Sequence, residues 1–118
     1  MPQKACNMAK TKSTVCQERF KDYCFFCGCP VIGREHHLVF GSANRQKADE
    51  DGLKVPICDH CHTIGKLWER IHDNTMAEKL SKMFGQAIYE RNALANKEVQ
   101  TIDEAREKFR RRYGQSYF

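Results

Sequence analysis

The sequence lacks the long apolar stretches that would anchor a protein in a membrane. No run among the 118 residues is apolar enough or long enough to cross a bilayer. The opening residues, MPQKACNMAK, also lack the apolar core of a secretory signal. We therefore expect a cytoplasmic protein without a membrane partner.

The cysteine content fits a complete set of disulfides badly. The chain has seven cysteines, an odd number, and disulfides are rare in the cytoplasm. A chain this short buries proportionately less surface than a larger one, so a bound metal would help to hold it together. Paired cysteines are accordingly expected to be metal ligands.

Four cysteines form two CxxC pairs, Cys24 with Cys27 and Cys58 with Cys61, separated by residues 28–57. Each CxxC turn places two thiolates on one side of a tight knuckle. Two knuckles supply the four soft ligands that zinc binds tetrahedrally. We therefore predict a structural Zn²⁺ at these four residues.

The remaining candidate ligands near the knuckles leave alternatives open. Cys29 gives the first knuckle a third thiol, although its spacing from the preceding cysteine is poorer. His60 or His62 could replace a cysteine, but neither is needed to complete four ligands. Cys6 and Cys16 are expected to be free thiols.

The apolar pattern predicts a single small α+β domain. Residues 1–13 are basic and without a period, which indicates a disordered or loosely held arm. Residues 14–118 are expected to form the domain. Its core, 24–74, contains two short strands and the start of a helix, and 75–118 contains two amphipathic helices.

Particular residues set the expected helices. Thr14 with Gln17 suggests a capping box, and Thr101 with Glu104 suggests a second one. A further helix is expected to begin after the second knuckle, in HTIGKLWERIHDN. We assign to packing the apolar residues at helical spacing, together with Trp68. These are Met76, Leu80, Met83, Phe84, Ala87, Ile88 and Leu94 in the first long helix, and Ile102, Ala105, Phe109 and Tyr113 in the second.

Two adjacent histidines, His36 and His37, lie between the knuckles. VIGREHHLV predicts a strand or bent hairpin, and LKVPI predicts a second strand whose Pro56 lies at its end. If the knuckles meet at one zinc, the end of the first strand comes close to the helix that starts at His62. The histidines of both segments would then form one site.

HHLVF followed by CDHCH resembles the motif of the HNH endonucleases, many of which carry two zinc knuckles. The wider run HHLVFGSANRQKADEDGLKVPICDHCH, then RIHDN, is most similar to the phage recombination enhancement function (Ref-type) nucleases, and FRRRYGQSY resembles the tail of related phage proteins. The resemblance covers roughly residues 24–118. It implies a ββα-metal finger with one catalytic divalent metal, in a phage-derived protein that acts in the bacterial cell and is linked to recombination.

The resemblance implies a role for each of four histidines. His37 matches the general base, and His36 matches the metal ligand before it. His62 matches the histidine that follows the last cysteine, and His72 matches a further histidine of the Ref-type members. The metal would be Mg²⁺, Mn²⁺ or another divalent ion, and an imidazole-rich site favours transition metals.

One position departs from the family pattern. Leu53 and Gly52 stand where the middle asparagine of the family is expected. Asn44 is the nearest candidate to take its part in orienting the base, unless a backbone carbonyl fixes the tautomer. Glu35 could replace His36 as a ligand if the strand is shifted by one residue.

These observations predict a metal-dependent endodeoxyribonuclease acting on single- or double-stranded DNA, with a recombinase filament as a possible partner. The net charge of +5 permits a nucleic-acid partner without requiring one. The residues predicted to contact DNA phosphates are Arg34, Arg45, Lys47, Arg110, Arg111 and Arg112. The alternative is a non-catalytic zinc-knuckle module that binds DNA or a protein. A colicin-like toxin would share the active site but would need an immunity partner or an export signal.

Overall fold

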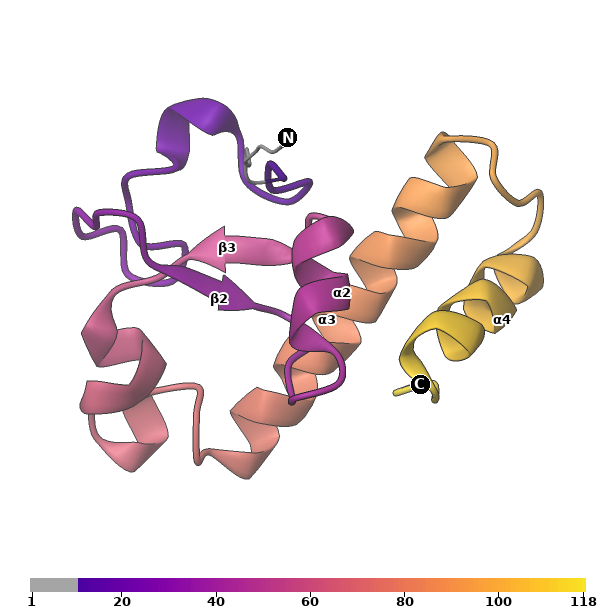
Figure 1. Ribbon diagram of the computed structural model, residues 1–118. Coiled ribbons are helices and arrows are strands. Elements are labelled where there is room, and N and C mark those ends of the chain that lie inside the picture. The colour runs from indigo at the N-terminus through magenta and orange to yellow at the C-terminus, as the bar shows by residue number, and fades with distance from the viewer. Residues whose placement is uncertain (1–10) are drawn as a thin grey trace, which may run out of the picture.

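A two-stranded antiparallel hairpin lies between helices in the computed structural model, which describes residues 11–118 (Figure 1). The chain is a small α+β domain, as predicted. In chain order its elements are η1 (Glu18–Phe20), β2 (Glu35–His37), α2 (Arg45–Glu50), β3 (Lys54–Pro56), the π-helical turn η2 (His60–Ile64), η3 (Leu67–Glu69), α3 (Thr75–Ala95) and α4 (Ile102–Tyr113). Among the described residues, no helix is both long enough and apolar enough to cross a membrane.

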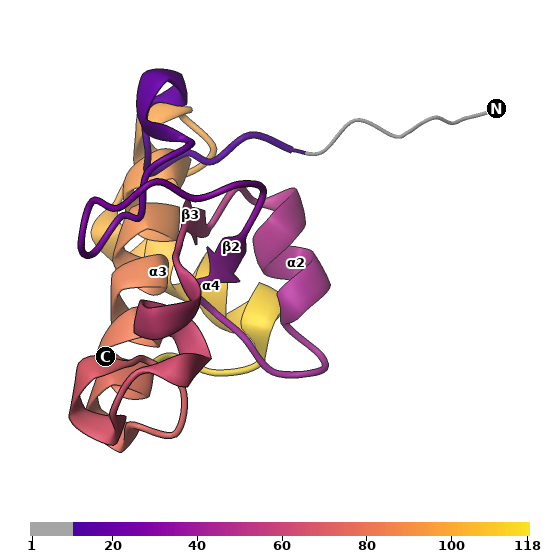
Figure 2. The same ribbon diagram turned by 90° about the vertical axis from the view of Figure 1, so that its left-hand side faces the viewer.

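The hairpin register decides which way the two adjacent histidines point. His36 pairs with Val55, and His37 pairs with Lys54. Successive side chains of a strand point to opposite faces, and α3 and α2 lie on opposite sides of the hairpin (Figure 2). His36 therefore points toward α3 and His37 toward α2. Pro56 ends β3, as expected.

Aromatic packing holds α4 against α3. The Tyr89 ring of α3 lies 5.3 Å from Phe109, which stacks on Tyr113 at 4.5 Å. The capping box of Thr101 and Glu104 is present, and α4 ends as expected at Gly114, whose φ is 88°. The larger core cluster joins both helices to the hairpin and consists of Leu38, Val39, Ala48, Leu53, Val55, Ile88, Tyr89, Phe109 and Tyr113.

The helix expected just after the second knuckle does not form as one continuous helix. The chain forms two separate turns, η2 and η3, because the backbone is extended at Gly65 and again at Arg70. A Cβ at Gly65 would lie 2.5 Å from the carbonyl oxygen of His60, so only glycine fits this break. Trp68, assigned to packing, is 74% exposed.

The capping box predicted for Thr14 and Gln17 does not form. The Thr14 hydroxyl donates to the carbonyl of Gly52 instead of capping η1. The nearby Ser13 hydroxyl donates to the carbonyl of Lys54. Ser13 and Thr14 are thus attached to β3 and to the turn before it, whereas residues 1–10 of the predicted arm lie outside the described part.

The packed face of α3 is only partly the one predicted. Ile88 is buried, but Met76, Leu80 and Phe84 are exposed. Ile102, expected on the packed face of α4, is exposed too. The apolar pattern also does not mark Gly85, where α3 lies so close to Leu38 and Val39, just after β2, that an added Cβ would clash with them.

Candidate metal centres

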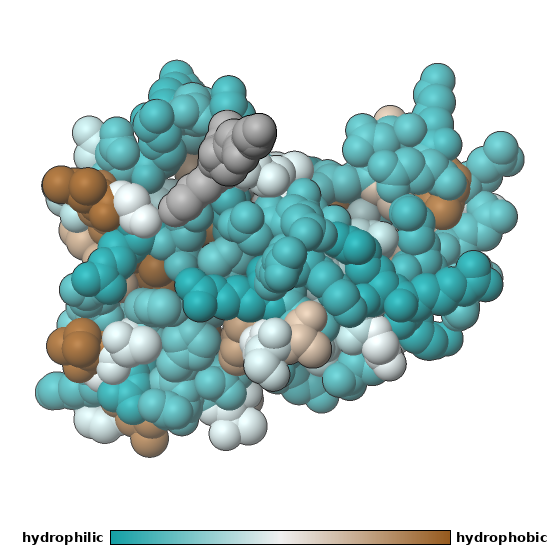
Figure 3. All heavy atoms as spheres, viewed as in Figure 1, coloured by the Kyte–Doolittle hydropathy of each residue, from teal (hydrophilic) through white to brown (hydrophobic). Residues whose placement is uncertain are grey.

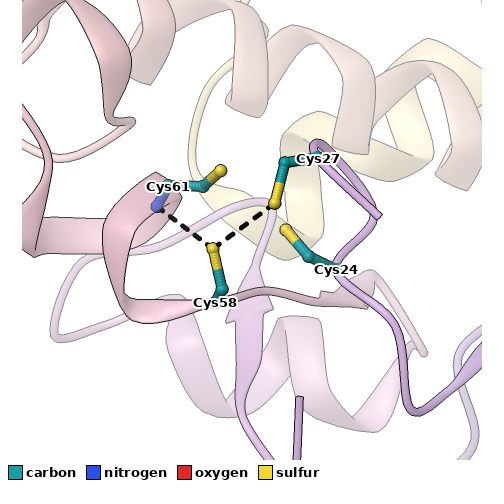
Figure 4. A group of neighbouring side chains, drawn as sticks. All are labelled: Cys24, Cys27, Cys58 and Cys61. Carbon is teal, nitrogen blue, oxygen red and sulfur yellow. Dashed lines mark hydrogen bonds between the residues drawn. The ribbon is translucent and has the colours of Figure 1, made fainter. Parts of the chain in front are cut away.

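The two CxxC pairs come together as predicted (Figure 4). The sulfur atoms of Cys24, Cys27, Cys58 and Cys61 all lie within 4.8 Å of one another. Those of Cys27 and Cys58 are 3.7 Å apart. A tetrahedron with zinc–sulfur bonds of about 2.3 Å has edges of roughly 3.8 Å. The four cysteines can therefore hold a structural metal such as zinc.

Hydrogen bonds within the knuckles favour thiolates. The backbone N–H of Cys61 points at the Cys58 sulfur, 3.4 Å away. Burial opposes ionisation of Cys24, but N–H groups of the two knuckles outweigh it and lower the pKa of Cys24 to about 6. Burial raises the pKa of Cys61. Four thiolates cannot coexist at this distance without a cation, and a divalent metal would replace the remaining protons.

Cys29 lies beside this centre but outside the group of four. Its thiol contacts those of Cys27 and Cys58, which raises the pKa of Cys29 to about 12. Cys16 is a free thiol, as expected, while Cys6 lies outside the described residues. Neither alternative histidine ligand is needed, because four cysteines complete the set.

A second cluster consists of His36, His62 and His72, each offering one ring nitrogen within 4.8 Å of the others. His36 comes from β2 and His62 from η2. His72 is held beside His62 because its backbone N–H donates to the His62 carbonyl at 3.1 Å. The Nε2 atoms of these two rings face each other at 2.9 Å. Strand β2, the turn η2 and the segment before α3 thus bring three imidazoles together.

The hydrogen bonds of His36 determine its tautomer. The Ser81 hydroxyl donates its only proton to the Leu38 carbonyl, at 2.8 Å. Its oxygen also lies 2.8 Å from His36 Nε2, so Nε2–H is the donor and Nδ1 carries the lone pair. Burial, followed by repulsion from the other histidines, lowers the pKa of His36 to about 3. His36 is therefore a neutral imidazole with a free lone pair.

Neighbouring groups also act on the other two histidines. The carboxylate of Glu78 lies 3.5 Å from His72 Nδ1, which favours the proton on that atom. The Phe40 ring packs edge-on against His72 at 4.8 Å. Burial, followed by the charge of His72, lowers the pKa of His62. Neutral imidazoles are the form that binds metal, and three of them leave further coordination positions open.

His37 is outside this cluster, on the opposite face of β2. Its Nε2 lies 3.1 Å from Asp49 Oδ1. The same oxygen accepts a bond of 2.9 Å from the fully buried Lys54 ammonium. Burial acts to raise the pKa of Asp49, but the Lys54 and His37 hydrogen bonds outweigh it and lower that pKa.

The contact on His37 is therefore a carboxylate rather than an asparagine. Asn44 occupies the N-cap position of α2, and its side chain makes no capping bond there. Glu35, the alternative ligand, faces Lys54 at 3.5 Å. The register places His36, and not Glu35, in the histidine cluster.

The predicted DNA-contacting residues fall into two groups. Arg34 and Arg45 lie close enough to His62 to lower its pKa, although Arg34 also pairs with Asp59 at 2.9 Å. The others serve contacts within the fold. Lys47 donates to the Arg112 carbonyl, Arg112 binds Asp51 and Glu50, and Arg110 and Arg111 both pair with Glu107.

The residues that support the histidines were missed in the sequence. Asp49 belongs to the acidic run 49–51, which reads as solvated surface. Ser81 lies between Leu80 and Lys82 of α3, and nothing in the local sequence marks it. Lys54 was detectable in principle, because it lies between apolar residues in LKVPI. If that strand is buried, the lysine ammonium needs a counter-charge.

Comparisons with protein-family models, with curated proteins and with solved structures gave no match to this chain. The resemblance carried by HHLVF and CDHCH therefore stays a prediction. What the geometry establishes is narrower. The chain is a small α+β domain in which four cysteines and, separately, three histidines lie close enough together that each group could hold a metal ion.

Proposed function

We propose that this protein is a metal-dependent endonuclease of the HNH type that hydrolyses DNA phosphodiester bonds. The observation that carries the proposal is the convergence of His36, His62 and His72 beside the cysteine centre. A purely structural zinc knuckle does not need three further imidazoles whose ring nitrogens lie this close together. His37, the next residue along β2, would supply the base from the opposite face of that strand.

The four histidines have different roles in the proposed hydrolysis. His36, His62 and His72 would hold a divalent ion, which when bound stabilises charge on the phosphate and on the leaving oxygen. His37 accepts a proton from water, and the water oxygen forms a bond to phosphorus. The bond from phosphorus to the 3′ oxygen breaks, and that oxygen takes a proton from solvent. The products carry 5′-phosphate and 3′-hydroxyl ends.

Charge near the histidines supports a polyanionic substrate. Arg34 and Arg45 lie near His62, and the Lys82 ammonium lies 4.7 Å above the Phe40 ring that packs on His72. These three cations are placed to bind phosphates flanking the reacting one. A recombinase filament as partner rests on the Ref-type resemblance alone.

A nicking assay tests the proposal. Supercoiled plasmid and circular single-stranded DNA, bare or coated with a recombinase, are incubated with the protein and Mg²⁺, Mn²⁺ or Ni²⁺. Cutting is expected with at least one metal, and His37→Ala should abolish it. His60→Ala is the matched control, because that exposed histidine pairs with Glu69 outside the cluster. Equal cutting by both variants would contradict the proposal.

A non-catalytic zinc-knuckle module that binds a protein is the second candidate. An apolar groove of about 440 Å³ favours it, lined by Phe25, Phe26, Trp68, Leu80 and Phe84 among others. In Figure 3, hydrophobic residues gather on the side that carries the knuckles and the turns η2 and η3, whereas most of the visible face is hydrophilic. No cutting under any of the tested conditions would support this candidate.

A further inference from the structure

One carboxylate oxygen joins an exposed loop helix to the proposed base and to a buried cation. Asp49 Oδ1 lies 3.1 Å from His37 Nε2 and 2.9 Å from Lys54 Nζ. The Lys54 side chain is fully buried. A buried ammonium needs a hydrogen-bonded counter-charge, and Asp49 provides the shorter of its two carboxylate contacts, with Glu35 at 3.5 Å.

The fold brings these groups together from one hairpin and the helix inside its loop. His37 and Lys54 are directly paired across β2 and β3, so their side chains share one face. Asp49 lies in the last turn of α2, which connects the two strands and covers that face. The Ser13 hydroxyl holds the Lys54 carbonyl on the outer edge of β3.

The donor and acceptor inventory fixes the tautomer of His37. The lysine ammonium has donors only, and an ionised carboxylate has acceptors only. Lys54 therefore keeps Asp49 as an acceptor. His37 Nε2 must then carry its proton toward Asp49, so that Nδ1 keeps the lone pair.

We propose that Asp49 and Lys54 are positioning residues for His37. Asp49 holds the imidazole with Nδ1 as its basic atom, and Lys54 holds Asp49 in place. This inference deepens the proposed endonuclease function and rests on it for its catalytic part. It assigns to a carboxylate and a buried lysine the orienting role that the sequence suggested for Asn44 or a backbone carbonyl.

A merely structural role predicts something different. If Asp49 serves only to neutralise Lys54, its loss should lower stability and leave the His37 tautomer and the turnover of folded protein unchanged. If it positions the base, its loss should lower kcat while KM for DNA changes little, since Asp49 approaches the substrate only through His37. The two roles can therefore be separated by measurement.

The experiment combines nitrogen-15 NMR of His37 with steady-state cleavage by the intact, metal-loaded protein. The intact protein should show protonated Nε2 and unprotonated Nδ1. Asp49→Ala should give a mixture of tautomers and lower kcat by about 10- to 100-fold, the usual effect of losing an orienting partner. Asp49→Asn, whose amide oxygen can still accept, should recover part of the loss. Glu50→Ala, on the same helix and facing Arg112, is the control.

The outcomes separate the two proposals. If the intact protein cuts DNA and Asp49→Ala matches Glu50→Ala in kcat, the positioning role is overturned while the endonuclease stands. A protonated Nδ1 in the intact protein overturns it as well. If the intact protein cuts nothing, the catalytic role of both residues falls with the proposed function. If Asp49→Ala does not fold, Lys54→Met tests the same positioning role. We expect this variant to lose less kcat than Asp49→Ala.

Discussion

Single hydroxyl and carboxylate groups give the candidate site its chemistry. His36 is 1% exposed, and its only side-chain hydrogen bond in the described structure is to Ser81. That hydroxyl leaves Nδ1 as the lone-pair atom because its own proton is used on the Leu38 carbonyl. A metal-binding histidine is usually oriented by such an outer partner. Ser81 should therefore control metal affinity without being a ligand.

Ser81→Ala is expected to weaken divalent-metal binding at the histidine cluster by about 10- to 100-fold. The reason is that His36 loses the acceptor that fixes its tautomer. Titration calorimetry with Mn²⁺ on the zinc-loaded protein measures the effect. The exposed Ser42→Ala should bind as the intact protein does, and equal affinity for both variants would exclude the orienting role.

The low pKa of His36 should also make the stability of the protein depend on pH. Its pKa in the folded protein is lowered to about 3, whereas an unfolded histidine titrates near 6.5. As pH falls below about 6.5, the unfolded state takes the proton first, and stability contributed by neutral His36 is progressively lost down to about pH 3.

Between about pH 7 and pH 5.5 this loss should reach about 1 kcal/mol. Urea unfolding of the protein without metal at the histidines should show it, and His36→Gln should show a flatter dependence. Parallel pH profiles for the two proteins would mean that His36 is not held neutral by the fold.

For single residues, the sequence predicts the metal ligands better than it predicts the residues that hydrogen-bond to them. The cysteines and histidines are chemically distinctive and occur at characteristic spacings, so their convergence can be anticipated. Ser81 and Asp49 are ordinary surface residue types, and only the folded chain brings them to His36 and His37. Their roles depend on tertiary contacts that no local pattern encodes.

Helix α3 sets the position of the histidine cluster through one close contact. A Cβ on Gly85 would lie 2.8 Å from Val39 Cγ2 and 2.9 Å from Leu38 Cβ. Gly85 is one helical turn after Ser81, so the same approach brings the Ser81 hydroxyl to His36. The apolar periodicity of α3 predicts a helix correctly but misjudges its packed face, because the contact is made by small residues.

Gly85→Ala should destabilise the protein by about 1–3 kcal/mol, as overpacking does, although alanine favours helix more than glycine. Urea unfolding measures this change. Lys79→Ala, on an exposed part of α3, should have little effect. An unchanged or raised stability for Gly85→Ala would show that α3 can move away from the hairpin without penalty.

The described residues form two core clusters, and the clusters differ in what stabilises them. One is aromatic and aliphatic and joins α3 and α4 to the hairpin. The other is small and includes two of the metal-ligating cysteines, with Val31, Ile57 and Ile71. Because this cluster has so few apolar groups, we expect the knuckle half to depend on a metal bound by the cysteines for its stability.

Cys61→Ser is accordingly expected to lose bound zinc and the tertiary structure of the knuckle half. Structural zinc contributes on the order of 10 kcal/mol to folding in small metal-binding domains. Zinc content and near-ultraviolet circular dichroism report the two losses. Cys16→Ser, at a free thiol, should change neither. A zinc-free Cys61→Ser protein with an intact near-ultraviolet spectrum would show that the metal is dispensable for the fold.

We propose that one chain carries two separate metal centres, one structural and one open to exchange. Native mass spectrometry of the protein dialysed against Mn²⁺ tests it most directly, with His62→Ala measured alongside. We expect one tightly held zinc in both proteins and a second, exchangeable ion in the intact protein alone. A single zinc in both would contradict the histidine centre and leave a zinc-knuckle binding module.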